Sequence, residues 1–148
     1  MKLSEGTSRD LFIAARSACL GTVDAADAPH LVPITFAVDE AGARGADRVY
    51  FAVDAKPKST TRLKRLENIR SHSSVCLLAD HYDADWTRLW WARADGVARI
   101  LTRDADRAAP IRLLTAKYPQ YEHQPPQGPV VEIEVARWSG WSFSEAAT

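Results

Sequence analysis

A run of basic residues follows an apolar stretch at residues 49–53 and carries the clearest chemistry in the sequence. Residues 56–70 contain six Lys or Arg and one acid, a local charge of +5 in a 148-residue chain of net charge +0. The first half of the run combines cations with hydroxyl groups where a helix is expected to begin. These residues are Lys56, Lys58, Ser59, Thr60 and Arg62. Free N–H groups at a helix start and charge-assisted hydrogen bonds hold phosphates and carboxylates, so the run predicts an anion-binding turn. An ordinary basic surface helix is the alternative that composition leaves open.

Helical phase separates two cations of this run. At about 100° per residue, Arg62 lies within about 40° of the centre of the apolar stripe made by Leu63, Leu66 and Ile69. Lys64 points almost the opposite way. We therefore expect Arg62 to face the site and Lys64 to face solvent.

All the tryptophans lie in the second half of the chain, at Trp86, Trp90, Trp91, Trp138 and Trp141. Trp86 stands in the polar segment 82–88, where a large ring caps a planar ligand or joins a subunit interface. For Trp90 and Trp91 core packing is the alternative, because adjacent strand residues face opposite ways.

Other chemistry is weakly marked. The histidines, His30, His72, His81 and His123, have no recognisable partners in sequence, and no catalytic side chain is identified. Residues 80–85 include metal-ligand types but lack a calcium-loop glycine and an H-x-x-x-H spacing. A solvated loop without a metal is expected there.

Composition indicates one compact domain over residues 1–148, because 46% of the chain is hydrophobic and no linker divides it. Net neutrality argues against a dedicated nucleic-acid or membrane-surface protein. The N-terminal residues lack the apolar segment of a signal peptide, so a cytoplasmic protein is expected.

Six strands and two or three helices are expected from periodicity and turn signals. The strands are placed at residues 19–24, 30–38, 48–53, 75–80, 89–101 and 130–137. A first helix is expected from a cap at Thr7 or Ser8 to Ala18, and a third from Thr102 toward Tyr118, with Pro110 kinking or restarting it. Gly96 is expected to bend or bulge the long strand. Strands joined mostly by hairpins favour a mainly β antiparallel barrel.

Several segments resemble one family in the family's own order. They are Leu-Gly-Thr-Val-Asp at 20–24, Pro-His-Leu-Val-Pro-Ile-Thr-Phe at 29–36, Lys-Pro-Lys at 56–58, Leu-Lys-Arg-Leu-Glu-Asn-Ile at 63–69, and Asp-Trp-Thr-Arg-Leu-Trp-Trp at 85–91 with Gly96. The chain resembles the split-barrel flavin and deazaflavin oxidoreductases of the pyridoxamine-phosphate oxidase superfamily. Within it, the chain is most similar to the probable F420-dependent branch of actinobacteria. The resemblance implies a six-stranded antiparallel split β-barrel.

The same resemblance implies the cofactor site. In that family the second strand runs along the edge of the cofactor ring, and the turn after the third strand grips the phosphate. The matching residues here are Val32, Pro33, Ile34, Thr35 and Phe36 on the strand, and Lys56, Lys58 and Ser59 in the turn, with Arg62 beside them. Phe51 and Ala52 are expected to close the ring pocket. The resemblance also implies a homodimer with the cofactor at its interface, where Trp86 is expected to contribute.

Pro33 has no N–H and suits a strand that faces a ligand, and an edge strand is the alternative. The oxidases of the superfamily place an Arg and a Lys on the second strand against the FMN phosphate, and this chain has neither there. F420 is therefore expected, with hydride transfer to an unidentified small conjugated substrate. The alternatives are an FMN-dependent oxidase or reductase, a non-catalytic flavin or deazaflavin carrier and, least favoured, a barrel that binds single-stranded nucleic acid.

Overall fold

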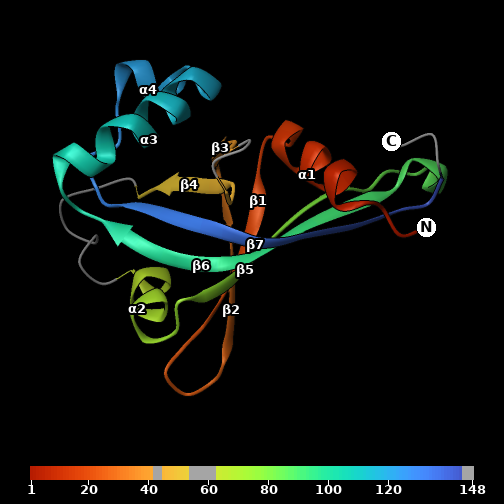
Figure 1. Cartoon of the computed structure of the whole chain (residues 1–148), viewed down its shortest axis with the longest axis horizontal. Coiled ribbons are helices and arrows are strands. Elements are labelled where there is room, and N and C mark those ends of the chain that lie inside the picture. The colour runs from red at the N-terminus through yellow and green to blue at the C-terminus, as the bar shows by residue number, and fades with distance from the viewer. Residues whose placement is uncertain (42–44, 54–62, 145–148) are drawn as a thin grey trace.

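The computed structural model describes residues 1–41, 45–53 and 63–144. Figure 1 shows a curled sheet with helices packed around it. The helices are α1 (Glu5–Ala14), α2 (Lys64–Ser71), α3 (Asp104–Lys117) and α4 (Gln120–His123), with a short 3-10 helix η3 (Trp86–Arg88). The strands are β1 (Ala18–Val23), β2 (Pro29–Ile34), β3 (Ala37–Asp39), β4 (Arg48–Ala52), β5 (Ser74–His81), β6 (Trp90–Leu101) and β7 (Val130–Ser142).

All seven strands belong to one antiparallel sheet in the order β2-β1-β5-β6-β7-β4-β3. Although β2 and β3 lie at opposite edges, only Thr35 and Phe36 separate them in the chain. Consecutive Cα atoms are about 3.8 Å apart, so Ile34 and Ala37 are at most about 11 Å apart. The two edges of the sheet must therefore approach each other, and the sheet curls into a split barrel. Among the described strands, no ladder pairs β2 with β3, so the barrel is not closed.

The predicted antiparallel split barrel is confirmed, but the predicted count of six strands is wrong. The single strand expected at residues 30–38 is divided into β2 and β3 by Thr35 and Phe36, which belong to neither strand. Alternating apolar residues run through this interruption, so the hydrophobic pattern could not reveal it.

The first helix begins and ends earlier than predicted. Its N-cap is Ser4, whose side chain accepts a hydrogen bond from the Thr7 N–H, and the helix ends at Ala14. Ser8 is buried, and its hydroxyl donates to the Ser4 carbonyl at 2.8 Å. Ser4 caps the helix because its hydroxyl satisfies one of the free N–H groups of the first turn.

The long helix α3 has Arg103 rather than Thr102 at its N-cap position, without a side-chain capping bond, and it continues through Pro110 without restarting. A proline in a helix removes one hydrogen bond. Here Pro110 is buried, and burial of its ring offsets part of that cost.

The pairing of the two longest strands, β6 and β7, extends the sheet beyond the prediction. Strand β7 reaches Ser142 rather than residue 137, because Trp138 and Trp141 pair with Ala94 and Trp91 of β6. The expected irregularity in β6 is confirmed by a register shift between Asp95 and Gly96. A Cβ atom on Gly96 would lie only 2.3 Å from the Glu134 backbone oxygen, so only glycine permits this approach.

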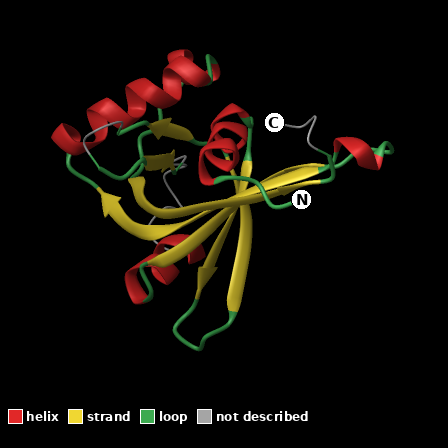
Figure 2. Ribbon diagram, turned by 45° about the vertical axis from the view of Figure 1, so that its right-hand side comes forward, coloured by secondary structure: helices red, strands yellow, loops and turns green. Residues whose placement is uncertain are grey.

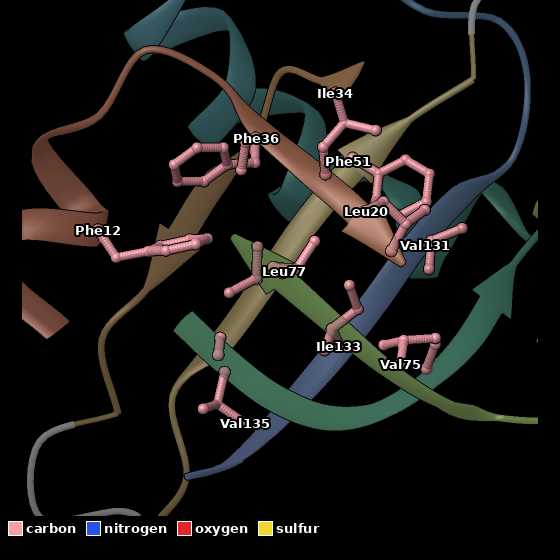
Figure 3. Packing of buried hydrophobic residues seen from close by; sticks show 14 of the residues in the cluster. Phe12, Leu20, Ile34, Phe36, Phe51, Val75, Leu77, Val131, Ile133 and Val135 are labelled. Atoms are coloured by element: carbon pink, nitrogen blue, oxygen red, sulfur yellow. The ribbon is translucent and has the colours of Figure 1, made fainter. Parts of the chain in front are cut away.

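The main core fills the inside of the curled sheet, as Figure 3 shows. The rings of Phe12 and Phe36 lie 4.7 Å apart, which joins α1 to the chain between β2 and β3. Helix α1 packs on β6 and β7, α2 on β1 and β6, and α3 on β3 and β4. Figure 2 shows α2 and α3 on different sides of the sheet. No helix within the described ranges has the length and apolar character needed to cross a membrane.

Candidate active site

A pocket of about 240 Å³ lies where the ends of β2 and β4 approach each other. The bend of the chain at Thr35 and Phe36 brings these two strand ends together. The lining residues come from both strand ends, from the start of α2 and from α4. They are Pro33, Ile34, Thr35, Ala52, Val53, Leu63, Arg65 and Tyr121.

Arg65 is the charged residue in the described part of the pocket lining. Its side chain is half-buried, and burial lowers the pKa of the guanidinium. Within the described residues no carboxylate lies at ion-pair distance from Arg65. A half-buried cation without a counter-ion is costly and favours an anionic ligand.

Helix α2 holds Arg65 at the pocket through its buried face. Leu66 and Ile69 belong to the core, and Asn68 is 1% exposed. The Asn68 side chain donates a 2.9 Å hydrogen bond to the Thr22 hydroxyl on β1. This buried bond fixes the rotation of α2 against the sheet, and therefore the side on which Arg65 emerges.

Two hydroxyl groups form a second polar feature of the pocket. The hydroxyls of Thr35 and Tyr121 lie 3.1 Å apart, and either can donate to the other. Whichever one donates, the second keeps a proton for a ligand acceptor. The pair therefore offers a hydrogen-bond donor beside the apolar wall of Pro33 and Ile34.

The predicted strand residues divide between pocket and core. Pro33, Ile34, Thr35 and Ala52 line the pocket. Pro33 also lies on an edge strand, so the edge position alone is sufficient to explain it. Val32 is partly buried and packs against the core, and Phe36 and Phe51 are core residues with exposed fractions of 0% and 1%.

The predicted anion-binding residues Lys56, Lys58, Ser59 and Arg62 lie outside the described residues. In sequence, the segment 54–62 joins Val53 to Leu63, and both of these line the pocket. Lys64 is exposed as predicted, and its Nζ lies 3.4 Å from the Asp24 carboxylate.

Trp86 lies at the other end of the sheet from the pocket. Trp86 comes just before Trp90, the first residue of β6. The pocket residue Ala52 pairs with Val130, and Val130 also pairs with Leu101, the last residue of β6. At about 3.3 Å per residue, the 12 residues of β6 extend over about 36 Å along the strand. The Trp86 ring is 67% exposed, so it is free to contact another molecule.

The described part of the pocket lining contains no histidine. His81 Nε2 lies 2.9 Å from an Asp83 carboxylate oxygen, and His72 lies 3.8 Å from Asp27. His30 Nδ1 is buried and has no hydrogen-bond partner among the residues that the structure describes. No group of three or more potential metal ligands occurs in the described ranges.

Sequence reasoning missed Arg65 and Tyr121 as pocket residues. Arg65 belongs to the basic run 56–70 that the sequence marked, but no signal within that run distinguished it from its neighbours. Tyr121 falls between the expected third helix and the last expected strand, and no local pattern connects it to Thr35. Its place depends on how α3 and α4 pack.

The family model of pyridoxamine 5'-phosphate oxidase matches residues 5–142 of the chain. No curated protein sequence is significantly similar to it.

Solved structures share the fold at low sequence identity. A conserved hypothetical protein from Mycobacterium tuberculosis is 19% identical with a TM-score of 0.74, covering 99% of this chain and 89% of its own. A FAD-binding protein from Mesorhizobium loti is 16% identical with a TM-score of 0.71, covering 95% of each chain. The FAD binding protein from Mycobacterium smegmatis is 21% identical with a TM-score of 0.65, covering 97% of this chain and 100% of its own.

These likenesses extend over nearly the whole chain and agree with the curled antiparallel sheet and with the family match. The chain belongs to the pyridoxamine 5'-phosphate oxidase family.

Proposed function

We propose that the pocket binds a flavin or deazaflavin and that the protein is an oxidoreductase, with F420 as the first candidate cofactor. The observation that carries this proposal is Arg65, a half-buried cation without a carboxylate partner among the described residues, in a pocket lined by the predicted residues of β2 and β4. Flavins and deazaflavins of this class combine a planar ring with a phosphate-bearing tail. An apolar wall next to a cation suits both parts.

The residues present fit such a ligand. Pro33, Ile34 and Ala52 form an apolar wall, and the small Ala52 side chain leaves space for a ring. Arg65 can hold a phosphate or carboxylate through charge-assisted hydrogen bonds. We further propose that Lys56, Lys58, Ser59 and Arg62 extend this anion site.

A bound reduced flavin or deazaflavin supplies hydride chemistry of its own. The chain's residues then have three tasks. Arg65 binds the anionic part of the ligand, the Thr35 and Tyr121 hydroxyls orient a polar edge, and the apolar wall excludes water.

The choice among cofactors rests on charge. Strand β2 carries no Lys or Arg, so the FMN phosphate lacks the cations that the oxidases of the superfamily provide there. The basic segment and Arg65 can instead serve the phosphodiester and acidic tail of F420. FMN is the alternative, and FAD is a further candidate because two structures of the same fold are FAD-binding proteins.

We also propose that the protein is a homodimer with the cofactor at its interface. The pocket, at about 240 Å³, is smaller than the roughly 300–1,000 Å³ of typical ligand sites, so a second subunit is well suited to complete it. Beside the ion-paired Arg93 and Asp95, one face of the sheet carries three exposed apolar residues, Leu31, Leu78 and Val97, exposed by 71%, 41% and 52%. The register places them on the same face, which suits a partner surface.

Spectra of the purified protein provide a first test. Bound flavin absorbs and fluoresces differently from bound deazaflavin, and a protein purified without cofactor can be reconstituted with each. Reduction of a conjugated acceptor by the reconstituted protein would support the oxidoreductase proposal. Tight cofactor binding without turnover of any acceptor would favour the non-catalytic carrier.

A further inference from the structure

The two residues that connect β2 to β3, Thr35 and Phe36, are held from outside the sheet. Three side chains at the end of α3 and in α4 contact them, and we call Lys117, Tyr118 and Tyr121 the α3–α4 clasp. Lys117 Nζ lies 3.7 Å from the centre of the Phe36 ring. The Phe36 N–H donates to the Tyr118 hydroxyl at 3.1 Å, and the Tyr121 and Thr35 hydroxyls lie 3.1 Å apart.

Tyr118 is the most constrained member of the clasp. Its side chain is buried, and its hydroxyl donates to the Arg16 carbonyl at 2.8 Å while accepting from Phe36. Burial raises the pKa of this phenol, so it keeps its proton and can perform both roles. The Arg16 guanidinium stacks on the same ring, with Cζ 4.9 Å from its centre, and donates to the Lys117 carbonyl.

The clasp acts where the sheet itself provides least support. Thr35 and Phe36 lie between two strands, outside the ladders that hold β2 and β3. Buried backbone N–H groups require an acceptor, and for Phe36 that acceptor is the Tyr118 hydroxyl. The direction in which the chain leaves β2 therefore depends on a side chain more than 80 residues away.

We infer that Lys117 and Tyr118 are positioning residues of the pocket and that Tyr121 contacts the ligand directly. Ligand binding is then coupled to the docking of α3 and α4 against the connection between β2 and β3 at Thr35 and Phe36. The ligand class, a planar heterocycle with a polar edge, rests on the proposed function. The positioning itself does not, because its contacts are present without a ligand.

Two substitutions separate these roles. Tyr118→Phe removes the acceptor of the Phe36 amide while keeping the buried ring, and Tyr121→Phe removes the hydroxyl that faces the pocket. The matched control is Tyr50→Phe, which also deletes a buried tyrosine hydroxyl. That hydroxyl bonds to Glu132 at 3.1 Å and does not line the pocket.

The first measurement needs no ligand. Amide hydrogen exchange followed by NMR should show the Phe36 amide exchanging roughly 5- to 150-fold faster in Tyr118→Phe, as expected for loss of a buried hydrogen bond. In Tyr50→Phe the rate should stay close to that of the wild type. Unchanged Phe36 exchange in Tyr118→Phe, or equal acceleration in Tyr50→Phe, would overturn the positioning role.

The second measurement uses F420 and FMN as probes, at a temperature where all four proteins are fully folded. Tyr118→Phe and Tyr121→Phe should each weaken the better probe roughly 5-fold or more, and Tyr50→Phe should not. A purely structural role would lower the melting temperature without changing the affinity of the folded protein. Wild-type affinity in both variants would refute the inference. If the wild type binds neither probe, the proposed function fails, and the exchange data still decide whether the clasp positions the wall.

Discussion

Replacement of Arg65 by Met should weaken ligand binding without lowering stability. Methionine keeps the length and apolar stem of the side chain but removes the charge. Arg65 has no ion pair within the described residues, so its replacement breaks no ion pair among them. Burial lowers the pKa of its guanidinium, which means that the folded state holds this charge at a cost.

The expected loss of affinity follows from the bond that Arg65 would make. A hydrogen bond to a charged group contributes about 1.5–3 kcal/mol, which corresponds to a dissociation constant about 10- to 150-fold higher. The free energy of unfolding should change by no more than about 0.5 kcal/mol or should rise, because the half-buried charge that is removed has no ion pair in the part of the chain that the structure describes. Few substitutions combine these two results, so together they identify a binding residue.

Fluorescence titration with F420 and urea unfolding, both on the same preparations, measure the two quantities. Lys64→Met is the control, since Lys64 is a neighbouring cation that is exposed and pairs with Asp24. It should change affinity by less than about fivefold. Lys58→Ala should cost about 1.5–3 kcal/mol of cofactor affinity, like Arg65→Met. Equal losses from Arg65→Met and Lys64→Met would mean that the helix acts only as a diffuse positive field, and the reasoning would be refuted.

Three further predictions concern the fold, a buried amine and the dimer. Gly96→Ala should destabilise the protein by about 1–3 kcal/mol in urea unfolding, because its Cβ would lie 2.3 Å from a backbone oxygen, whereas Gly6→Ala should not, as nothing lies within 4 Å. Burial lowers the pKa of Lys117 from 10.5 to about 8, so between these values the unfolded chain holds a proton that the folded chain has lost. The stability of the wild type relative to Lys117→Met should therefore rise with pH from about 8 to 10.5, and a difference that stays constant over this range would refute the shift. Trp86→Ala should weaken dimerisation or cofactor binding, in light scattering and titration, more than it lowers the melting temperature, because the ring is 67% exposed. A monomeric wild type would remove the interface from the site.

The fold was largely predictable because local patterns determine it. Alternation located the strands, and Gly96 marked the bulge that the structure contains. The break at Thr35 and Phe36 was not predictable, because both neighbouring strands continue the same apolar alternation. Only the opposite edge positions of β2 and β3 in the sheet make a bend necessary there.

The lining of the candidate pocket was predictable only in part, because some of its residues are brought there by contacts between distant parts of the sequence. Pro33, Thr35 and Ala52 were named from the sequence and lie together in the pocket. Tyr121 meets Thr35 through the packing of α3 and α4, which depends on contacts between residues distant in sequence. Phe51 was expected to close the ring pocket, and it lies on the predicted strand. The pairing of β4 with β7 turns its side chain into the core instead.

The central claim is that the pocket binds a flavin or deazaflavin, and side-by-side titration of the wild-type protein with F420, FMN and FAD tests it most directly. We predict saturable binding with F420 tighter than FMN, and weaker binding in Arg65→Met. Submicromolar FMN binding with no measurable F420 binding would replace the cofactor while leaving the site intact. Absence of binding for all three ligands would contradict the account.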